Sequence, residues 1–131
     1  MILVDSSVWI EFFRASSRFD LAAAIDFDEV VTCLPVVQEV LQGFDQPRAF
    51  RIARQAMFAL PIVESPLSAE VFEQAVDLYR AARRAGFTVR SGVDYLIAAC
   101  ALRHSLAVVH RDRDFDALAR VAALEVKNLE A

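Results

Sequence analysis

Five acidic side chains in this sequence stand where carboxylates could act together on a metal ion. They come from four separate segments and are Asp5, Glu39, Asp94, Asp112 and Asp114. The last two follow directly on an apolar run, in the stretch "LAVVHRDRDFDALA". Carboxylates that converge in a partly desolvated cleft repel one another, and a hard divalent cation turns that repulsion into attraction. Because every candidate ligand is an oxygen, the pattern favours a site for Mg²⁺ or Mn²⁺.

Each acid taken singly also has an ordinary structural explanation. Asp5 precedes "SSVWIEFF" and Asp94 opens an apolar helix, so either side chain could cap a helix or complement its dipole. Glu39 could be a solvated residue on a helix flank, and Asp116 a first-turn acid. A common site is favoured because distant carboxylates each stand where a strand ends or a buried helix opens.

Alternating strands and helices would position these acids. Short apolar runs predict strands at residues 1–4, 28–35, 61–65, 106–110 and 124–129, and helical spacing predicts helices at 8–13, 35–44, 46–60, 69–86, 94–104 and 114–122. This alternation predicts an α/β fold of three layers, α/β/α, with a short, mostly parallel central sheet in one domain spanning residues 1–131. If the first and fourth strands are neighbours, Asp5 and the Asp112–Asp116 group meet at one rim of the sheet.

Two helices carry further expectations. The helix over 94–104 is apolar almost all round and should be buried between layers. In the helix over 69–86, Ser68 should be the cap, Gly86 should end the helix, and one apolar face should form. That face comprises Val71, Phe72, Ala75, Val76, Tyr79 and Ala82.

Composition limits the class of protein. The chain has 131 residues, a net charge of −4 and 56% hydrophobic residues, but no apolar run long enough to span a bilayer and no signal-like start, so we expect a soluble, cytoplasmic protein. Cys33 and Cys100 are expected to be buried thiols without a redox role, and His104 and His110 to be structural rather than zinc ligands. Large apolar side chains exceed what one small core needs, which predicts a homodimer; they are Trp9, Phe12, Phe13, Phe44 and Phe58.

The sequence resembles a known family, the PIN domains, and within it the VapC-type toxins of bacterial type II toxin–antitoxin pairs. The resemblance covers nearly the whole chain. It rests on the order and spacing of "ILVDSSVWIEFF", "PVVQEVLQG", "TVRSGVDYLIAACAL" and "VVHRDRDFDALA".

The resemblance implies a Mg²⁺-dependent ribonuclease whose acidic pocket consists of Asp5, Glu39, Asp94 and an aspartate of the last motif. Asp5 and Asp94 would hold the metal, with Mn²⁺ as a substitute. Asp112 ranks slightly ahead of Asp114 as the fourth acid, and both stay open. Ser6 or Ser7 would assist, and a VapB-type antitoxin would cover the pocket.

The net charge gives no sign of a nucleic-acid binder, so RNA would need a local group of cations. Arg80, Arg83, Arg84 and Arg90 lie just upstream of Asp94 and are the candidates for phosphate contacts. The alternative for Arg80 is an ion pair with Glu73 or Asp77 on a solvated helix face.

Two other functions were weighed. A metal-dependent phosphatase is disfavoured because its Asp-x-Asp motif belongs after the first strand, whereas "DRD" follows the fourth. A PIN-like interaction domain that has lost cleavage is the non-enzymatic alternative, against which the complete set of acids argues.

Overall fold

A single parallel sheet organises the molecule. The computed structural model describes residues 1–14 and 19–130. Its strands are β1 (Ile2–Val4), β2 (Val30–Cys33), β3 (Ile62–Val63), β4 (Ala107–His110) and β5 (Val126–Asn128). Their order is β3-β2-β1-β4-β5, and each neighbouring pair is parallel. The predicted α/β fold is confirmed, and the described sheet is entirely parallel rather than mostly so.

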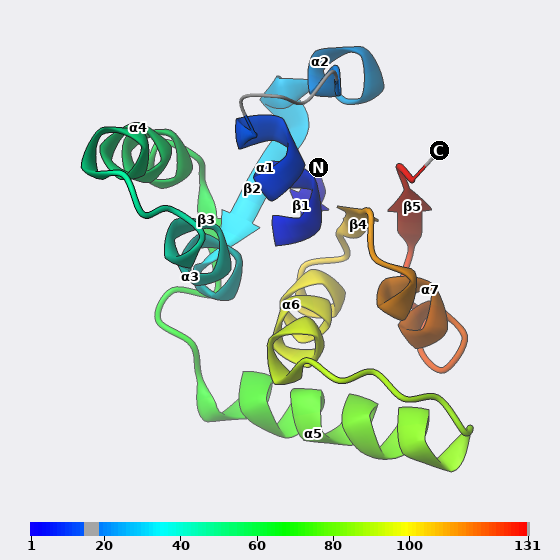
Figure 1. Cartoon of the computed structure of the whole chain (residues 1–131). Coiled ribbons are helices and arrows are strands. Elements are labelled where there is room, and N and C mark those ends of the chain that lie inside the picture. Colours follow the sequence, from blue (N-terminus) through cyan, green and yellow to red (C-terminus); the bar gives the residue numbers. More distant parts are fainter. Residues whose placement is uncertain (15–18, 131) are drawn as a thin grey trace.

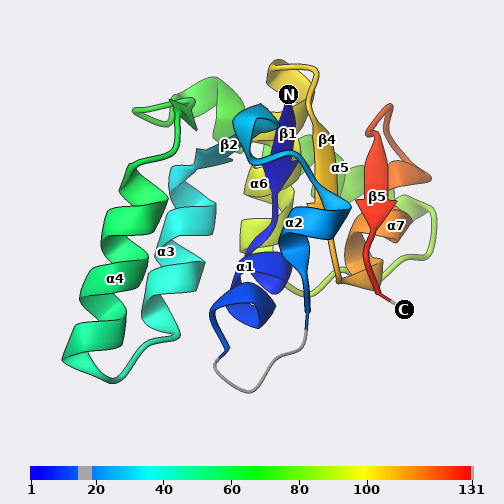
Figure 2. The ribbon, with the colours of Figure 1, turned by 90° about the horizontal axis from the view of Figure 1, so that it is seen from above.

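Helices cover both faces of this sheet. They are α1 (Ser6–Phe13), α2 (Leu21–Ala24), α3 (Leu34–Gln42), α4 (Pro47–Phe58), α5 (Ala69–Arg84), α6 (Gly92–Arg103) and α7 (Arg113–Ala119). α1 and α2 lie on one side of the sheet, and α5, α6 and α7 lie on the other (Figure 1). The view from above shows α2 in front of the strands and α6 behind them, with α3 and α4 side by side beyond β2 (Figure 2).

The strand order reverses between β1 and β4. Ile2 pairs with Ala107 and Val4 with Val109, and the amide of Asp5 donates to the carbonyl oxygen of Val109 at 2.9 Å. Ligands of open parallel sheets bind at the carboxyl ends of strands beside such a reversal. The expectation that the first and fourth strands are neighbours is therefore confirmed.

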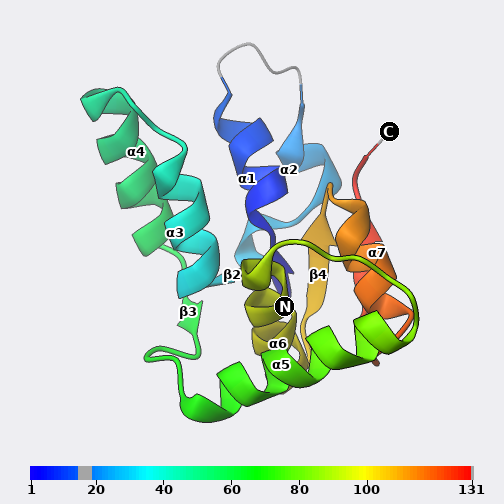
Figure 3. The same cartoon turned by 60° about the horizontal axis from the view of Figure 1, so that its bottom comes forward.

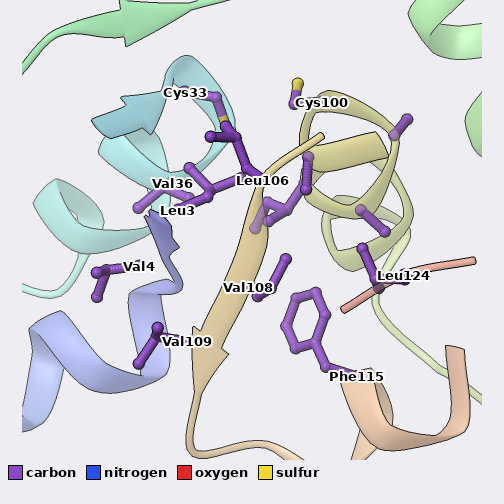
Figure 4. Packing of buried hydrophobic residues seen from close by; sticks show 14 of the residues in the cluster. Leu3, Val4, Cys33, Val36, Cys100, Leu106, Val108, Val109, Phe115 and Leu124 are labelled. Carbon is purple, nitrogen blue, oxygen red and sulfur yellow. The ribbon is translucent and has the colours of Figure 1, made fainter. Parts of the chain in front are cut away.

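The core explains why the two central strands, β1 and β4, are mostly apolar. Leu3, Val4, Val108 and Val109 are buried on both faces of the sheet, as parallel strands covered by helices require. Leu3, Val108 and Phe115 lie close together between β1, β4 and α7 (Figure 4). Helix α6 is buried along most of its length, as predicted from its uniformly apolar sequence.

Local signals set the helix boundaries. Asp5 and Asp112 are the N-caps of α1 and α7, and Pro35 lies in the first turn of α3, where a missing N–H costs nothing. Beyond α5, Gly86 adopts φ +85°, a left-handed conformation that favours glycine. Ser68 occupies the N-cap position of α5, but its buried hydroxyl has no hydrogen bond within the described residues, so its predicted capping contact is not formed.

Helix α5 differs from the prediction in one respect. Val71, Ala75 and Ala82 are buried as expected, whereas Phe72, Val76 and Tyr79 are 48%, 56% and 45% exposed. The reason is that α5 lies on the surface, mainly against α6, so only one narrow stripe of the helix is covered. Leu78 completes that inner stripe, and half of the predicted apolar face lies on the surface.

Two short elements were not predicted. Helix α2 and the 3-10 turn Phe27–Glu29 lie between α1 and β2, each started by an aspartate cap, Asp20 and Asp26. Both are too short to show helical periodicity in the sequence. Among the described residues, no helix combines the length and apolar character that crossing a membrane would need.

Candidate metal centre

Asp5 divides its two carboxylate oxygens between structure and the candidate centre. Oδ2 accepts hydrogen bonds from the Ser7 amide (3.0 Å) and hydroxyl (2.6 Å), which starts α1. Oδ1 is buried and has no hydrogen-bond partner among the described residues. Burial raises the pKa of Asp5, although the bonds from Ser7 oppose the shift. The side chain is thus both a cap and a candidate ligand.

Ser7 also joins two loops. While its hydroxyl donates to Asp5, the same oxygen accepts a hydrogen bond from the backbone amide of Arg111 at 2.9 Å. Arg111 lies in the turn between β4 and α7, so one hydroxyl connects the ends of the two central strands. The resemblance pointed to Ser6 or Ser7 as assisting residues, and the structure places both beside the acids.

Glu39 comes from the middle of α3 and is half-buried. The hydroxyl of Ser6 donates to Glu39 Oε1 at 2.8 Å. Burial raises the pKa of Glu39, and the charges of Asp5 and Asp112 add to the effect while the bond from Ser6 opposes it. Glu39 therefore points toward the acids rather than into solvent.

Asp94 lies in the first turn of α6 and is only 5% exposed. Burial, followed by the neighbouring charges of Asp5, Asp112, Glu39 and Asp114, raises the pKa of Asp94 to about 8. It is not the N-cap, a position held by Ser91. A carboxyl that favours the neutral form near neutral pH marks a place where negative charge lacks compensation.

The last two acids of the candidate centre, Asp112 and Asp114, come from the turn between β4 and α7 and the start of α7. Asp112 Oδ1 accepts a hydrogen bond from the Asp114 amide at 2.9 Å, which caps α7. Burial raises the pKa of Asp114, and the charge of Asp112 adds to the shift. Both side chains are half-buried, while Asp116, one turn along, faces His110 and Asn128 instead.

The five carboxylates form two overlapping groups. Ligand atoms of Asp5, Glu39 and Asp94 lie within 4.8 Å of one another, and so do those of Asp94, Asp112 and Asp114. Asp94 belongs to both groups. The acids lie in or directly before α1, α3, α6 and α7, and Figure 3 shows these four helices arranged around β4. An all-oxygen set with a buried, unpartnered oxygen fits a hard divalent cation such as Mg²⁺.

The predicted arginines separate into two positions. Arg90 lines a cavity of about 490 Å³ with Thr88, Arg113 and two of the acids, Asp112 and Asp114. Arg80, Arg83 and Arg84 are exposed on α5 and do not line this cavity. Arg80 forms no ion pair with Glu73 or Asp77 in the described structure, although both acids are close to it in sequence.

Arg113 is a residue that the sequence reasoning missed. It stands between Asp112 and Asp114, and its position within "DRD" was the available signal. His104 pairs with Glu64 at 3.0 Å, and His110 is buried. Cys33 and Cys100 are free thiols, buried as predicted.

This fold and this acidic rim define a class of protein. The family model of the PIN domain matches residues 2–121, and the chain belongs to the PIN domain family. "VapC ribonuclease Mb1587" of Mycobacterium bovis and "Ribonuclease VapC11" of Mycobacterium tuberculosis are each 38% identical to it over 133 residues. The alignments cover 95% of this chain and 96% of each relative.

Solved structures share the fold at lower identity. VapBC-5 from Mycobacterium tuberculosis aligns with a TM-score of 0.73 at 22% identity, covering 98% of both chains. FitAcB from Neisseria gonorrhoeae gives a TM-score of 0.74 at 21% identity, covering 98% of this chain and 97% of that one. VapC20 from Mycobacterium tuberculosis, described as a toxin that cleaves the sarcin–ricin loop, gives 0.71 at 20% identity, covering 95% and 98%.

Proposed function

We propose that this chain is a metal-dependent endoribonuclease and the toxin of a type II toxin–antitoxin pair. The observation that carries the proposal is the convergence of five carboxylates, with Asp5 Oδ1 buried and unpartnered and the pKa of Asp94 raised to about 8. Relatives at 38% identity over 95% of the chain bear the name ribonuclease, which supports RNA as the substrate.

Asp5 and Asp94 are the proposed metal ligands, with Mg²⁺ as the ion and Mn²⁺ as a substitute. Bound in such a set, the ion lowers the pKa of a coordinated water and neutralises charge on the phosphodiester. Glu39, held by Ser6, and Asp112 or Asp114 complete the acidic rim. Because Asp94 belongs to both groups of acids, one ion or two could be accommodated by these residues.

The reaction is hydrolysis of a phosphodiester. Water attacks phosphorus, one bridging P–O bond breaks, and the leaving oxygen takes up a proton. Glu39 is suited to accept the proton of the attacking water, since its raised pKa makes its carboxylate more basic than an exposed glutamate. Ser6 fixes the direction of that carboxylate.

Cations beside the acids would hold the RNA backbone. Arg90 and Arg113 share the cavity with Asp112 and Asp114, so they are the closest candidates for phosphate contacts. Arg80, Arg83 and Arg84 stay predicted contacts that would extend this surface along α5.

Cleavage of total RNA tests the proposal. The purified chain should cleave RNA with Mg²⁺ or Mn²⁺, lose that activity with a chelator, and bind Mn²⁺ at sub-millimolar to millimolar concentration. Asp94→Asn should abolish both properties. A wild-type chain that binds Mn²⁺ but leaves all RNA intact would instead indicate a PIN-like interaction domain that has lost cleavage.

An antitoxin is the proposed protein partner. Several of the similar structures are described as VapBC or toxin–antitoxin complexes. A groove of about 230 Å³ between α1 and α3 is lined by Ile10, Phe13, Val40 and Phe44, among others. Of the neighbouring aromatic residues on α1, Trp9 is buried at 4% exposure and Phe12 is 40% exposed. An amphipathic segment in this groove could reach the acids with a basic side chain.

A homodimer is also proposed, but through a different surface from the one that the large aromatic residues suggested. Phe72, Val76 and Tyr79 form an exposed apolar stripe on α5, next to a groove of about 510 Å³ that Val93 and Leu96 help to line. We name these five residues the α5 surface. A stripe beside a groove on one face can match a second copy of itself.

Because this nuclease would act on cellular RNA, we place it in the cytoplasm.

A further inference from the structure

His110 is a buried imidazole two residues before Asp112. It ends β4, is 0% exposed, and packs against the ring of Phe115 with centroids 5.3 Å apart. Burying a polar ring costs free energy unless its nitrogen atoms find partners. A valine or leucine would fill this volume without that cost, so the contacts of the two nitrogens indicate what the imidazole contributes.

The Nδ1 atom is an acceptor. The backbone amide of Asp112 donates to His110 Nδ1 at 3.1 Å. A neutral imidazole carries one proton, and with Nδ1 accepting, that proton resides on Nε2. Nε2 lies 3.2 Å from Asp116 Oδ1, although the direction is poor for a hydrogen bond.

Residues around the imidazole are themselves held by hydrogen bonds. Asn128 Nδ2 donates to Asp116 Oδ2 at 2.9 Å, and Asn128 is also the register partner of His110 in the sheet. The amide of Leu129 donates to the carbonyl oxygen of His110 at 2.7 Å. Strand β5 and Leu129 directly after it therefore hold the backbone of His110, while Asn128 holds Asp116 beside the imidazole.

Asp112 is consequently held from two directions. Its amide is bound by His110, and its Oδ1 accepts from the amide of Asp114. We propose that His110 is a positioning residue that fixes the Asp112 carboxylate at the rim of the acidic centre through the hydrogen bond from the Asp112 amide to Nδ1. The inference rests on the proposed function, since it concerns an acid of that centre. His110 is buried and is not one of the residues whose ligand atoms converge in the described structure.

Two substitutions distinguish the hydrogen-bond acceptor that His110 provides from the space that its side chain fills. His110→Asn places an amide oxygen near the position of Nδ1, so the Asp112 amide keeps an acceptor, whereas His110→Leu fills the space without one. Asp112 shares a group of converging ligand atoms with Asp94, a proposed metal ligand. Removing an outer hydrogen-bonding partner at a metal site weakens affinity by about 10- to 100-fold. His110→Leu should raise the Kd for Mn²⁺ by that factor, and His110→Asn should keep it within roughly 3-fold of wild type.

Control variants distinguish positioning from stability. Phe115→Leu loosens packing against the same ring and should lower the melting temperature without changing the Kd for Mn²⁺. Asn128→Ala, at an exposed residue, removes the partner of Asp116 and should weaken Mn²⁺ binding by less than His110→Leu does. If His110→Leu does not fold, His110→Phe, which keeps a buried ring but lacks the acceptor, takes its place, and a wild-type Kd for Mn²⁺ in that variant overturns the proposal.

A measurement without metal separates this inference from the proposed function. Hydrogen exchange of the Asp112 amide in the metal-free protein should be about 10-fold faster in His110→Leu than in wild type, and rescued in His110→Asn. Equal exchange in all three proteins would overturn the positioning role. A wild-type chain that fails to bind Mn²⁺ while the exchange pattern holds would count against the proposed function alone.

Discussion

At the scale of single residues, the carboxylates serve local structure and the acidic centre at once. Asp5 caps α1 with Oδ2 and leaves Oδ1 buried without a partner. Asp112 caps α7 with Oδ1 in the same manner. Capping and metal binding, which compete as explanations of a sequence, are therefore compatible for a group with two oxygens.

Asp5→Asn should separate these two roles. The amide keeps one oxygen that can accept from Ser7, so the fold should be retained, while RNA cleavage should fall by roughly 100-fold or more as a metal ligand is lost. In metal-free buffer the variant should be at least as stable as wild type, because a buried charge near other carboxylates is removed. Thermal unfolding with chelator and calorimetric titration with Mn²⁺ measure both effects, and wild-type cleavage by the variant would remove Asp5 from the centre.

Asp94 predicts a pH dependence of stability in metal-free buffer. Its pKa is about 8 in the folded protein and near 3.8 in an unfolded chain, so between these values the folded state binds the extra proton. This contribution to stability is complete below pH 3.8 and is lost as the pH rises through 8. Relative to wild type, Asp94→Asn should therefore gain stability from pH 5 to pH 8.5, by roughly 1–3 kcal/mol.

The control for this pH series is the same comparison with Mn²⁺ present. A bound cation favours the ionised carboxylate, so wild type should gain stability from Mn²⁺ at pH 8 while Asp94→Asn gains little. A stability difference between the two proteins that stays constant from pH 5 to pH 8.5 with chelator would contradict a raised pKa at Asp94.

At the scale of elements, α5 divides its charges between its two halves. Glu70 and Glu73 lie in the first half, Asp77 lies just past the middle, and Arg80, Arg83 and Arg84 follow in the second half. An antiparallel contact between two copies of α5 would set the acidic half of one against the basic half of the other. The exposed Val76 would lie near the middle of such a contact.

Val76→Glu should convert the proposed dimer to a monomer. It introduces a charge at the centre of the α5 surface, where each copy would have to bury it. Ile52→Glu on α4 is a matched control, because Ile52 is 55% exposed, as Val76 is 56% exposed, but lies outside this surface. Light scattering at micromolar concentration measures the mass. A monomeric wild type, or a dimer in both variants, would contradict the assignment of the interface.

Sequence periodicity predicted the strands, the buried α6 and the adjacency of the acids because each depends on local pattern or on the rules of parallel sheets. It could not predict which half of the α5 apolar face is covered, because that depends on how the whole helix lies on α6. The exact contacts at the acidic centre were equally out of reach. Nothing in the spacing of Ser7 and Arg111 indicates that a hydroxyl joins them.

At the scale of the whole molecule, we expect one antitoxin segment to bind both the acidic rim and the α1–α3 groove. A basic side chain among the carboxylates would compete with Mg²⁺, so raising Mg²⁺ should weaken inhibition. Neutralising that basic residue should cost more affinity with wild type than with Asp5→Asn. A double-mutant cycle measures the coupling, and additivity within about 0.5 kcal/mol would mean that the antitoxin inhibits from elsewhere.

The pairing of β1 with β4 has a consequence for the growing chain on the ribosome. Ile2 can pair with Ala107 only after the chain has been synthesised as far as β4, and Asp112 and Asp114 emerge later still. During much of translation Asp5 and Glu39 are therefore present without Asp94, Asp112 and Asp114, the carboxylates that complete the acidic centre. A nascent chain that has not yet reached Asp112 would lack the complete acidic centre, so the antitoxin would need to bind only chains synthesised beyond that point.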